Sequence, residues 1–113
     1  MNAEEMRQHR ARYNERMKVA DPFFKEFGAL DDRVYDGGAI DKKHKELMGL
    51  AISVATRCDQ CVLYHLDGCE REEANRAEVV EAIKIGVMAG GSITLPNARF
   101  AFEALEEGVA ETG

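Results

Sequence analysis

Two stretches of this chain are apolar around almost the whole circumference of a helix, and they constrain the fold more than any other feature. The first lies within residues 47–55 and the second within residues 79–88. Neither has the strict alternation of apolar and polar residues that is typical of a half-buried strand. The sequence therefore predicts an all-α fold with these two helices at its centre, and we expect Met48 and Met88 to fill the core.

The remaining segments predict about six helices in all, within one domain. Residues 1–19 form a mostly charged helix, and Asp21 followed by Pro22 is typical of a helix start. Asp41 caps the helix that contains residues 47–55, and the next helix runs from about residue 58 to 71. Asn75 and Glu78 have capping-box spacing for the helix that ends before Gly91. A last helix follows residue 96, and residues 106–113 are expected to fray. We expect a single domain over residues 1–113, with its core at about 22–105.

Composition and charge narrow the functional classes. The chain of 113 residues is 45% hydrophobic and 32% charged, with a formal net charge of −6. Its acidic residues are spread along the sequence, which argues against nucleic acid as a partner. No apolar run approaches the roughly 20 residues of a membrane span, so we expect a cytoplasmic protein without a membrane contact. Two nearly all-apolar helices are difficult to cover in a small monomer, which favours a homo-oligomer.

The run Cys58-Asp59-Gln60-Cys61-Val62-Leu63-Tyr64-His65 places two thiols and an imidazole on one face of the predicted helix. The thiolate is the reactive form of cysteine, and His65 lies one turn from Cys61, where it could accept the thiol proton. Cys58 lies at the first turn, where the helix dipole favours negative charge. A Cys58–Cys61 bond closes a very short loop, so it suits redox cycling better than structural stabilisation.

The helices before and after residue 57 predict a fourth participant. If they form an antiparallel hairpin at 1.5 Å per residue, Glu46 lies about 15 Å before the turn and His65 about 10 Å after it. The two residues then come level to within about a turn. A carboxylate at that level would orient the imidazole.

The cysteines also allow a metal site or a structural role to be considered. Cys58, Cys61, His65 and Cys69 form a Cys3His set, but on one helix the first and last lie about 16 Å apart, whereas zinc needs its sulfurs within about 4 Å of one another. We therefore expect no metal ion and no cofactor. Cys69 is expected to be a small core residue. The pair could also serve as a redox sensor or a metal-binding remnant in a non-catalytic oligomer.

The spacing of Glu46, Cys58, Cys61 and His65, followed by the capped helix E-A-I-K-I-G-V-M-A-G-G, resembles the carboxymuconolactone decarboxylase superfamily and, within it, the AhpD-like alkylhydroperoxidases. The resemblance covers about residues 22–105. The sequence departs from that pattern at Gln60, where a His is common, and at Cys69 and Glu73, where a small residue and a Gly are usual.

The resemblance implies an AhpD-like helical fold that assembles as trimers or hexamers, with the CxxC motif at the start of a helix. It implies a peroxidase that acts on a peroxide and is recycled by an unidentified dithiol or disulfide reductase partner. Cys61 would attack the peroxide, Cys58 would resolve the product to a disulfide, and Glu46 with His65 would relay the proton. Lactone decarboxylase activity is the least favoured interpretation, because those members lack the thiol pair.

Overall fold

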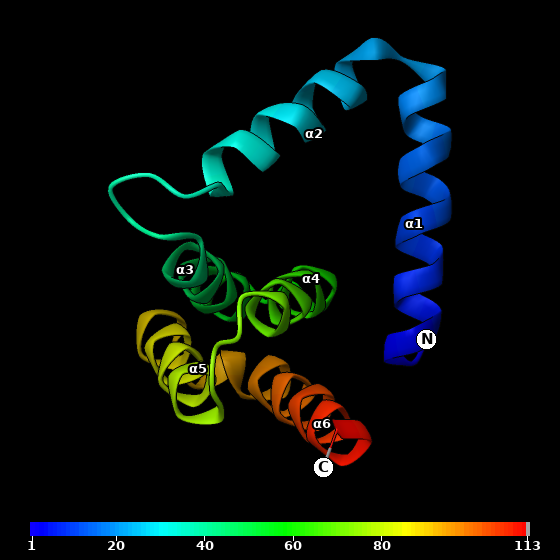
Figure 1. The fold of residues 1–113 in the computed structure, drawn as a ribbon. Helices are drawn as coiled ribbons and strands as arrows, with labels where there is room; N and C mark the ends of the chain where they lie inside the picture. The colour runs from blue at the N-terminus through cyan, green and yellow to red at the C-terminus, as the bar shows by residue number, and fades with distance from the viewer. Residues whose placement is uncertain (113) are drawn as a thin grey trace. The chain divides into compact units, whose positions relative to one another are not determined.

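The structure is a computed structural model that describes the backbone of residues 1–112 and the side chains of residues 1–108, and every regular element in that range is helical. The elements are α1 (Ala3–Ala20), α2 (Pro22–Tyr35), α3 (Lys42–Ala55), α4 (Asp59–Arg71), α5 (Arg76–Gly90), the short 3-10 helix η1 (Ser92–Thr94) and α6 (Leu95–Thr112) (Figure 1). The predicted all-α fold is confirmed. The chain divides into two compact units, residues 1–36 and residues 37 onwards.

The first unit consists of α1 and α2, which meet at a single residue. Asp21 ends α1, and its side chain accepts a hydrogen bond from the backbone N–H of Phe23 at 2.8 Å, which starts α2. Neither helix contains a buried residue, so α1 is the solvated helix that its charge predicts. On α2, an exposed apolar stripe runs along one side of the helix, comprising Phe23, Phe27, Leu30 and Val34.

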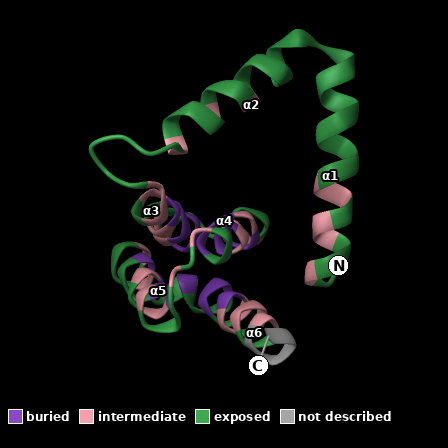
Figure 2. Ribbon diagram, viewed as in Figure 1, coloured by how far each residue is buried: buried purple, intermediate pink, exposed green. Residues whose placement is uncertain are grey.

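The second unit holds the hydrophobic core, which Figure 2 shows as the purple turns where α3, α4, α5 and α6 face one another. The core is made of small and branched side chains: Leu50, Val54, Val62, Leu66, Cys69, Val79, Ile83, Ala98 and Ala101. α3 packs against both α4 and α5, and α6 packs against α4 and α5. A Cβ atom at Gly86 would lie 2.6 Å from the carbonyl oxygen of Ala51, so a glycine is what allows α5 to approach α3 this closely.

Two expectations about these helices are wrong. Met48 and Met88 are 47% and 82% exposed, so they lie on the outer sides of α3 and α5 rather than in the core. The chain end from residue 106 was expected to fray, but α6 continues to Thr112.

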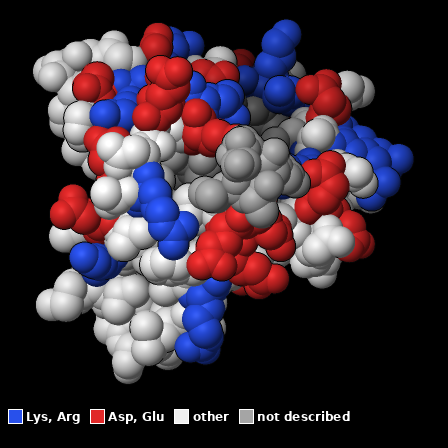
Figure 3. All heavy atoms as spheres, turned by 60° about the horizontal axis from the view of Figure 1, so that its bottom comes forward, with Lys and Arg blue, Asp and Glu red and all other residues white. Residues whose placement is uncertain are grey.

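None of the described helices has both the length and the apolar character needed to cross a bilayer. On the face shown in Figure 3, acidic and basic side chains are interspersed.

The connections on either side of α4 share one backbone motif. After α3, the N–H of Arg57 bonds to the carbonyl of Val54 and the N–H of Cys58 bonds to that of Ser53, the paired pattern of a Schellman motif. After α4, the N–H groups of Glu73 and Ala74 make the equivalent bonds. Arg57 and Glu73 both have φ of 60°, the left-handed conformation that favours glycine. The α3–α4 connection is therefore short and has a defined geometry.

Candidate active site

Cys58 and Cys61 are joined by a disulfide at the N-terminus of α4, as their spacing predicted, and their Cα atoms are 5.2 Å apart. Cys58 is the N-cap residue and not the first-turn residue, because the helix begins at Asp59. Its sulfur lies 3.2 Å from the backbone nitrogen of Cys61, whose N–H it accepts. A helix N-terminus stabilises negative charge, so this position suits a thiolate.

The two cysteine residues differ in their exposure. Cys61 is exposed, whereas Cys58 is only partly exposed. The N–H of Cys58 is held by the carbonyl of Ser53, at the end of α3, at 3.0 Å. Cys58 is therefore anchored between the two helices.

His65 and Glu46 meet as the hairpin geometry predicted. The Nδ1 atom of His65 lies 3.0 Å from Oε2 of Glu46, across the α3–α4 contact. Both residues are buried: the His65 side chain is 11% exposed and that of Glu46 is 4% exposed. With the carboxylate ionised, Nδ1–H donates this bond. The Tyr64 ring also packs against the imidazole in an edge-to-face arrangement, with centroids 5.1 Å apart.

A glycine on each helix makes room for the member of the His65–Glu46 pair that lies on the other helix. On α3, a Cβ atom at Gly49 would lie 2.5 Å from Nδ1 of His65, and on α4 a Cβ at Gly68 would overlap the carboxylate of Glu46. Any larger residue at either position would have to displace the His65–Glu46 pair. The close approach of the two helices thus depends on these glycines.

Lys42 contacts the second oxygen of the same carboxylate. Its Nζ lies 3.2 Å from Oε1 of Glu46, one turn earlier on α3. Sequence reasoning missed this residue, although its i, i+4 spacing from Glu46 is a usable signal. It also missed Gly49 and Gly68, because a close approach between helices leaves no local pattern.

A second polar contact ties the motif to α6. The Nδ2 atom of the buried Asn97 donates to Oδ1 of Asp59 at 2.8 Å. Asp59 lies between the two cysteines in the sequence, so this bond holds the first turn of α4 in place. Asn97 is a further residue that sequence reasoning did not identify.

Cys69 is not disulfide-bonded and is buried on α4. Burial first, and then the carboxylates of Glu46 and Glu78, raise the pKa of its thiol to about 12. The thiol is therefore protonated and unreactive at neutral pH. This agrees with the expectation that Cys69 is a core residue.

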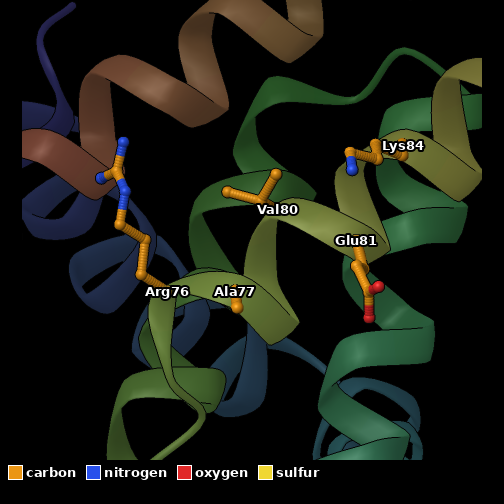
Figure 4. A pocket seen from close by; sticks show the side chains of 5 residues that line it. All are labelled: Arg76, Ala77, Val80, Glu81 and Lys84. Carbon is orange, nitrogen blue, oxygen red and sulfur yellow. The ribbon is translucent and has the colours of Figure 1, made fainter.

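The described residues contain no group of three or more His, Cys, Asp or Glu side chains placed to hold a metal ion. A shallow depression lies along α5, lined by Arg76, Ala77, Val80, Glu81 and Lys84 (Figure 4). Figure 4 shows these side chains spreading apart and not converging on a point, and none of them belongs to the thiol site.

The structure is thus that of a helical protein with a CxxC thiol pair. Its all-α unit contains a disulfide at a helix N-terminus and a buried histidine–carboxylate pair. The chain belongs to the carboxymuconolactone decarboxylase family, whose family model matches residues 21–107. The resemblance inferred from the sequence is thus confirmed for the family, and the AhpD-like branch is consistent with it.

The chain is similar to several solved structures, two of which are described as members of this family, and to curated proteins. The crystal structure of TM1620 from Thermotoga maritima is 39% identical, with a TM-score of 0.89, over 96% of this chain and 98% of that one. A second structure of TM1620 is described as a carboxymuconolactone decarboxylase family protein for which a part in the antioxidative response is suggested. The family protein lpg0406 from Legionella pneumophila is 30% identical, with a TM-score of 0.78, over 93% of this chain and 91% of that one. The "Uncharacterized protein 4 in cox locus" of Paracoccus denitrificans is 32% identical over 72% of this chain and 73% of its own length.

Proposed function

We propose that this protein is a thiol-dependent peroxidase in which Cys61 attacks the peroxide, Cys58 resolves the product, and His65 with Glu46 relays the proton. The observation that carries the proposal is the Cys58–Cys61 disulfide at the start of the helix that holds His65 one turn after Cys61, where the imidazole contacts the buried Glu46; Cys61 is the more exposed of the two cysteines. The suggested antioxidative role of TM1620 supports the same class of activity.

The first half of the cycle oxidises Cys61. His65 accepts the thiol proton at Nε2, because Nδ1 is engaged by Glu46. The Cys61 thiolate attacks the terminal oxygen of the peroxide, the O–O bond breaks, and the proton on His65 passes to the departing alkoxide. The products are an alcohol and a sulfenic acid on Cys61.

The second half forms the disulfide that the structure contains. The Cys58 thiolate, stabilised at the N-cap of α4, attacks the sulfur of the sulfenic acid, and hydroxide leaves and takes a proton to become water. A dithiol reductant then donates two electrons, and it is itself oxidised to a disulfide while Cys58 and Cys61 return to thiols. Attack by that reductant on the exposed Cys61 releases Cys58 as the stabilised thiolate.

The decisive experiment is peroxide consumption by the reduced protein across several dithiol donors. Cys61→Ser should abolish turnover. Cys58→Ser should complete one turnover and leave a sulfenic acid on Cys61, which a sulfenic-acid trapping reagent and mass spectrometry detect. Cys69→Ala is the matched control, because its thiol lies in the core and should not affect turnover. Retained turnover in Cys61→Ser, with a sulfenate on Cys58, would reverse the two cysteine roles.

The proton relay is tested separately. Glu46→Gln keeps the shape of the side chain and removes its charge, and we expect turnover to fall by about 10- to 10⁴-fold while fold and assembly stay intact. Circular dichroism and sedimentation verify the fold. Unchanged turnover in a folded Glu46→Gln protein would restrict the relay to His65.

A non-catalytic redox sensor is the alternative outcome of the same assay. In that case peroxide would form the Cys58–Cys61 disulfide once, no donor would support turnover, and oxidation would change assembly. The exposed apolar stripe of α2 and the exposed Met48, Ile52, Ile85 and Met88 provide surfaces on which assembly could respond. Either function fits a reducing compartment such as the cytoplasm.

We also propose that the protein works as a homo-oligomer, a trimer or a hexamer. The stripe on α2 has the 4-3-4 spacing of a helix–helix seam, and α3 and α5 each carry exposed apolar residues. A second copy of the chain would cover such surfaces. Sedimentation of the wild type beside Phe27→Glu tests this, since the substitution should lower the assembly state if the stripe is an interface.

A further inference from the structure

Lys42 lies beside the buried pair and has no part in the peroxidase steps described above. Its ammonium group is 3.2 Å from Oε1 of Glu46, while Oε2 of the same carboxylate is 3.0 Å from Nδ1 of His65. Each carboxylate oxygen therefore has a different nitrogen partner. The Lys42 side chain is 32% exposed, so it links the buried carboxylate to the surface of α3.

The burial of Glu46 makes its charge balance important. A carboxylate that is 4% exposed is costly to ionise unless a cation compensates it. His65 can supply that cation only when it is protonated, and a protonated imidazole cannot accept a thiol proton. A second cation is needed if the carboxylate is to stay charged while His65 is neutral.

We propose that Lys42 is this second cation: it neutralises the carboxylate of Glu46 and so allows His65 to work as a neutral base at physiological pH. The inference deepens the proposed function and rests on it for its catalytic meaning, but its electrostatic content can be measured without turnover. Lys42 is thus a positioning residue that acts through Glu46.

Among the described ion pairs of Glu46, Lys42 supplies the only lysine or arginine. On α4, the Cys69 thiol is neutral, since its pKa is raised to about 12 by burial and by Glu46 and Glu78, and the rings of Tyr64 and His65 pack edge to face. On α5, Glu78 is paired with Lys43 at 2.9 Å. The α6 residues packed into the core are uncharged: Ala98 and Ala101.

Lys43 provides a matched control for Lys42. Its side chain is also 32% exposed, it lies on the same turn of α3, and it too pairs with a carboxylate. Removing either lysine changes the net charge by one unit, but only Lys42 touches Glu46. A comparison of Lys42→Met with Lys43→Met therefore separates the specific ion pair from the general field of the protein.

The test is a titration of His65 by NMR in protein that contains ¹³C-labelled histidine, assigned by comparison with His65→Gln. The disulfide form is used, because Cys58 and Cys61 do not titrate in it. Lys42→Met should raise the His65 midpoint by about one pH unit, a tenfold gain in proton affinity, since the imidazole becomes the main cation facing Glu46. Lys42→Arg should restore the wild-type midpoint, and Lys43→Met should leave it unchanged.

An unchanged midpoint in Lys42→Met, or an equal shift in Lys43→Met, would overturn the proposal. The acid limb of kcat/KM should move upward by the same amount as the midpoint. If the midpoint moves but no donor supports peroxide turnover in the wild type, then the ion pair stands and the proposed peroxidase fails. The two inferences are therefore distinguishable in one series of proteins.

Discussion

Gly68→Ala should lower the free energy of unfolding of the protein, although alanine is normally the better helix former. In an open helical position the substitution gains about 0.5–1 kcal/mol, because glycine loses more backbone freedom on folding. At Gly68 the new Cβ would overlap the carboxylate of Glu46. Forcing an extra methyl group into a packed contact costs about 1–3 kcal/mol, and loss of the buried, charged bond to His65 costs about 1.5–3 kcal/mol. We expect a net destabilisation of about 2–5 kcal/mol.

Urea denaturation followed by circular dichroism measures this change, with peroxide turnover as the second readout. Gly28→Ala on α2 is the control, since nothing lies within 4 Å of the added atom, and it should be neutral or slightly stabilising with normal turnover. In the Glu46→Ala background, Gly68→Ala should cost much less, because the atom it displaces is gone. The reasoning is refuted if Gly68→Ala behaves like Gly28→Ala in both readouts.

Three further predictions concern the same hairpin and its surroundings. Gly49→Ala should displace the His65 ring and lower turnover by at least about tenfold, measured beside its circular dichroism, because the added Cβ would lie 2.5 Å from Nδ1. Glu73→Gly should raise the free energy of unfolding by up to about 1 kcal/mol without affecting turnover, since its φ of 60° favours glycine; an unchanged urea midpoint would contradict this. Cys69 should resist alkylation in the native reduced protein at pH 8. The pKa of the Cys69 thiol is raised to about 12 in the folded protein from its usual value near 9, so as pH rises the unfolded chain loses the thiol proton before the folded chain does. The contribution of Cys69 to stability is therefore intact below about pH 9 and is lost as pH rises toward 12.

The sequence predicted the parts of the site that follow from helical geometry. The spacing of Cys58, Cys61 and His65 identified one helix face, and the rise per residue of two antiparallel helices brought Glu46 level with His65, where the structure has a 3.0 Å contact. Such predictions need only the length of the connection. They succeed because a three-residue turn leaves an antiparallel pair little freedom.

Other features depend on how closely the helices approach each other, which no local pattern encodes. Gly49 and Gly68 look like ordinary helix glycines until their partner side chains are placed against them. Met48 and Met88 were assigned to the core because an apolar residue has the same sequence signature whether it lies in the core or on the outer side of a helix. The end of α6 was misjudged because chain termini are commonly frayed, whereas the alanines and glutamates in this stretch favour helix.

The Schellman connection between α3 and α4 also limits how this family can change in length. Cys58 gives its amide to the last turn of α3 and its sulfur to the first turn of α4, so one residue belongs to both helices. An inserted residue here would turn α4 by about 100° about its axis and carry His65 away from Glu46. Among relatives that keep the thiol pair, we therefore expect insertions and deletions in the segment between α2 and α3, and none between Ala55 and Asp59. The length of the α3–α4 connection is then a marker for members that retain the thiol site.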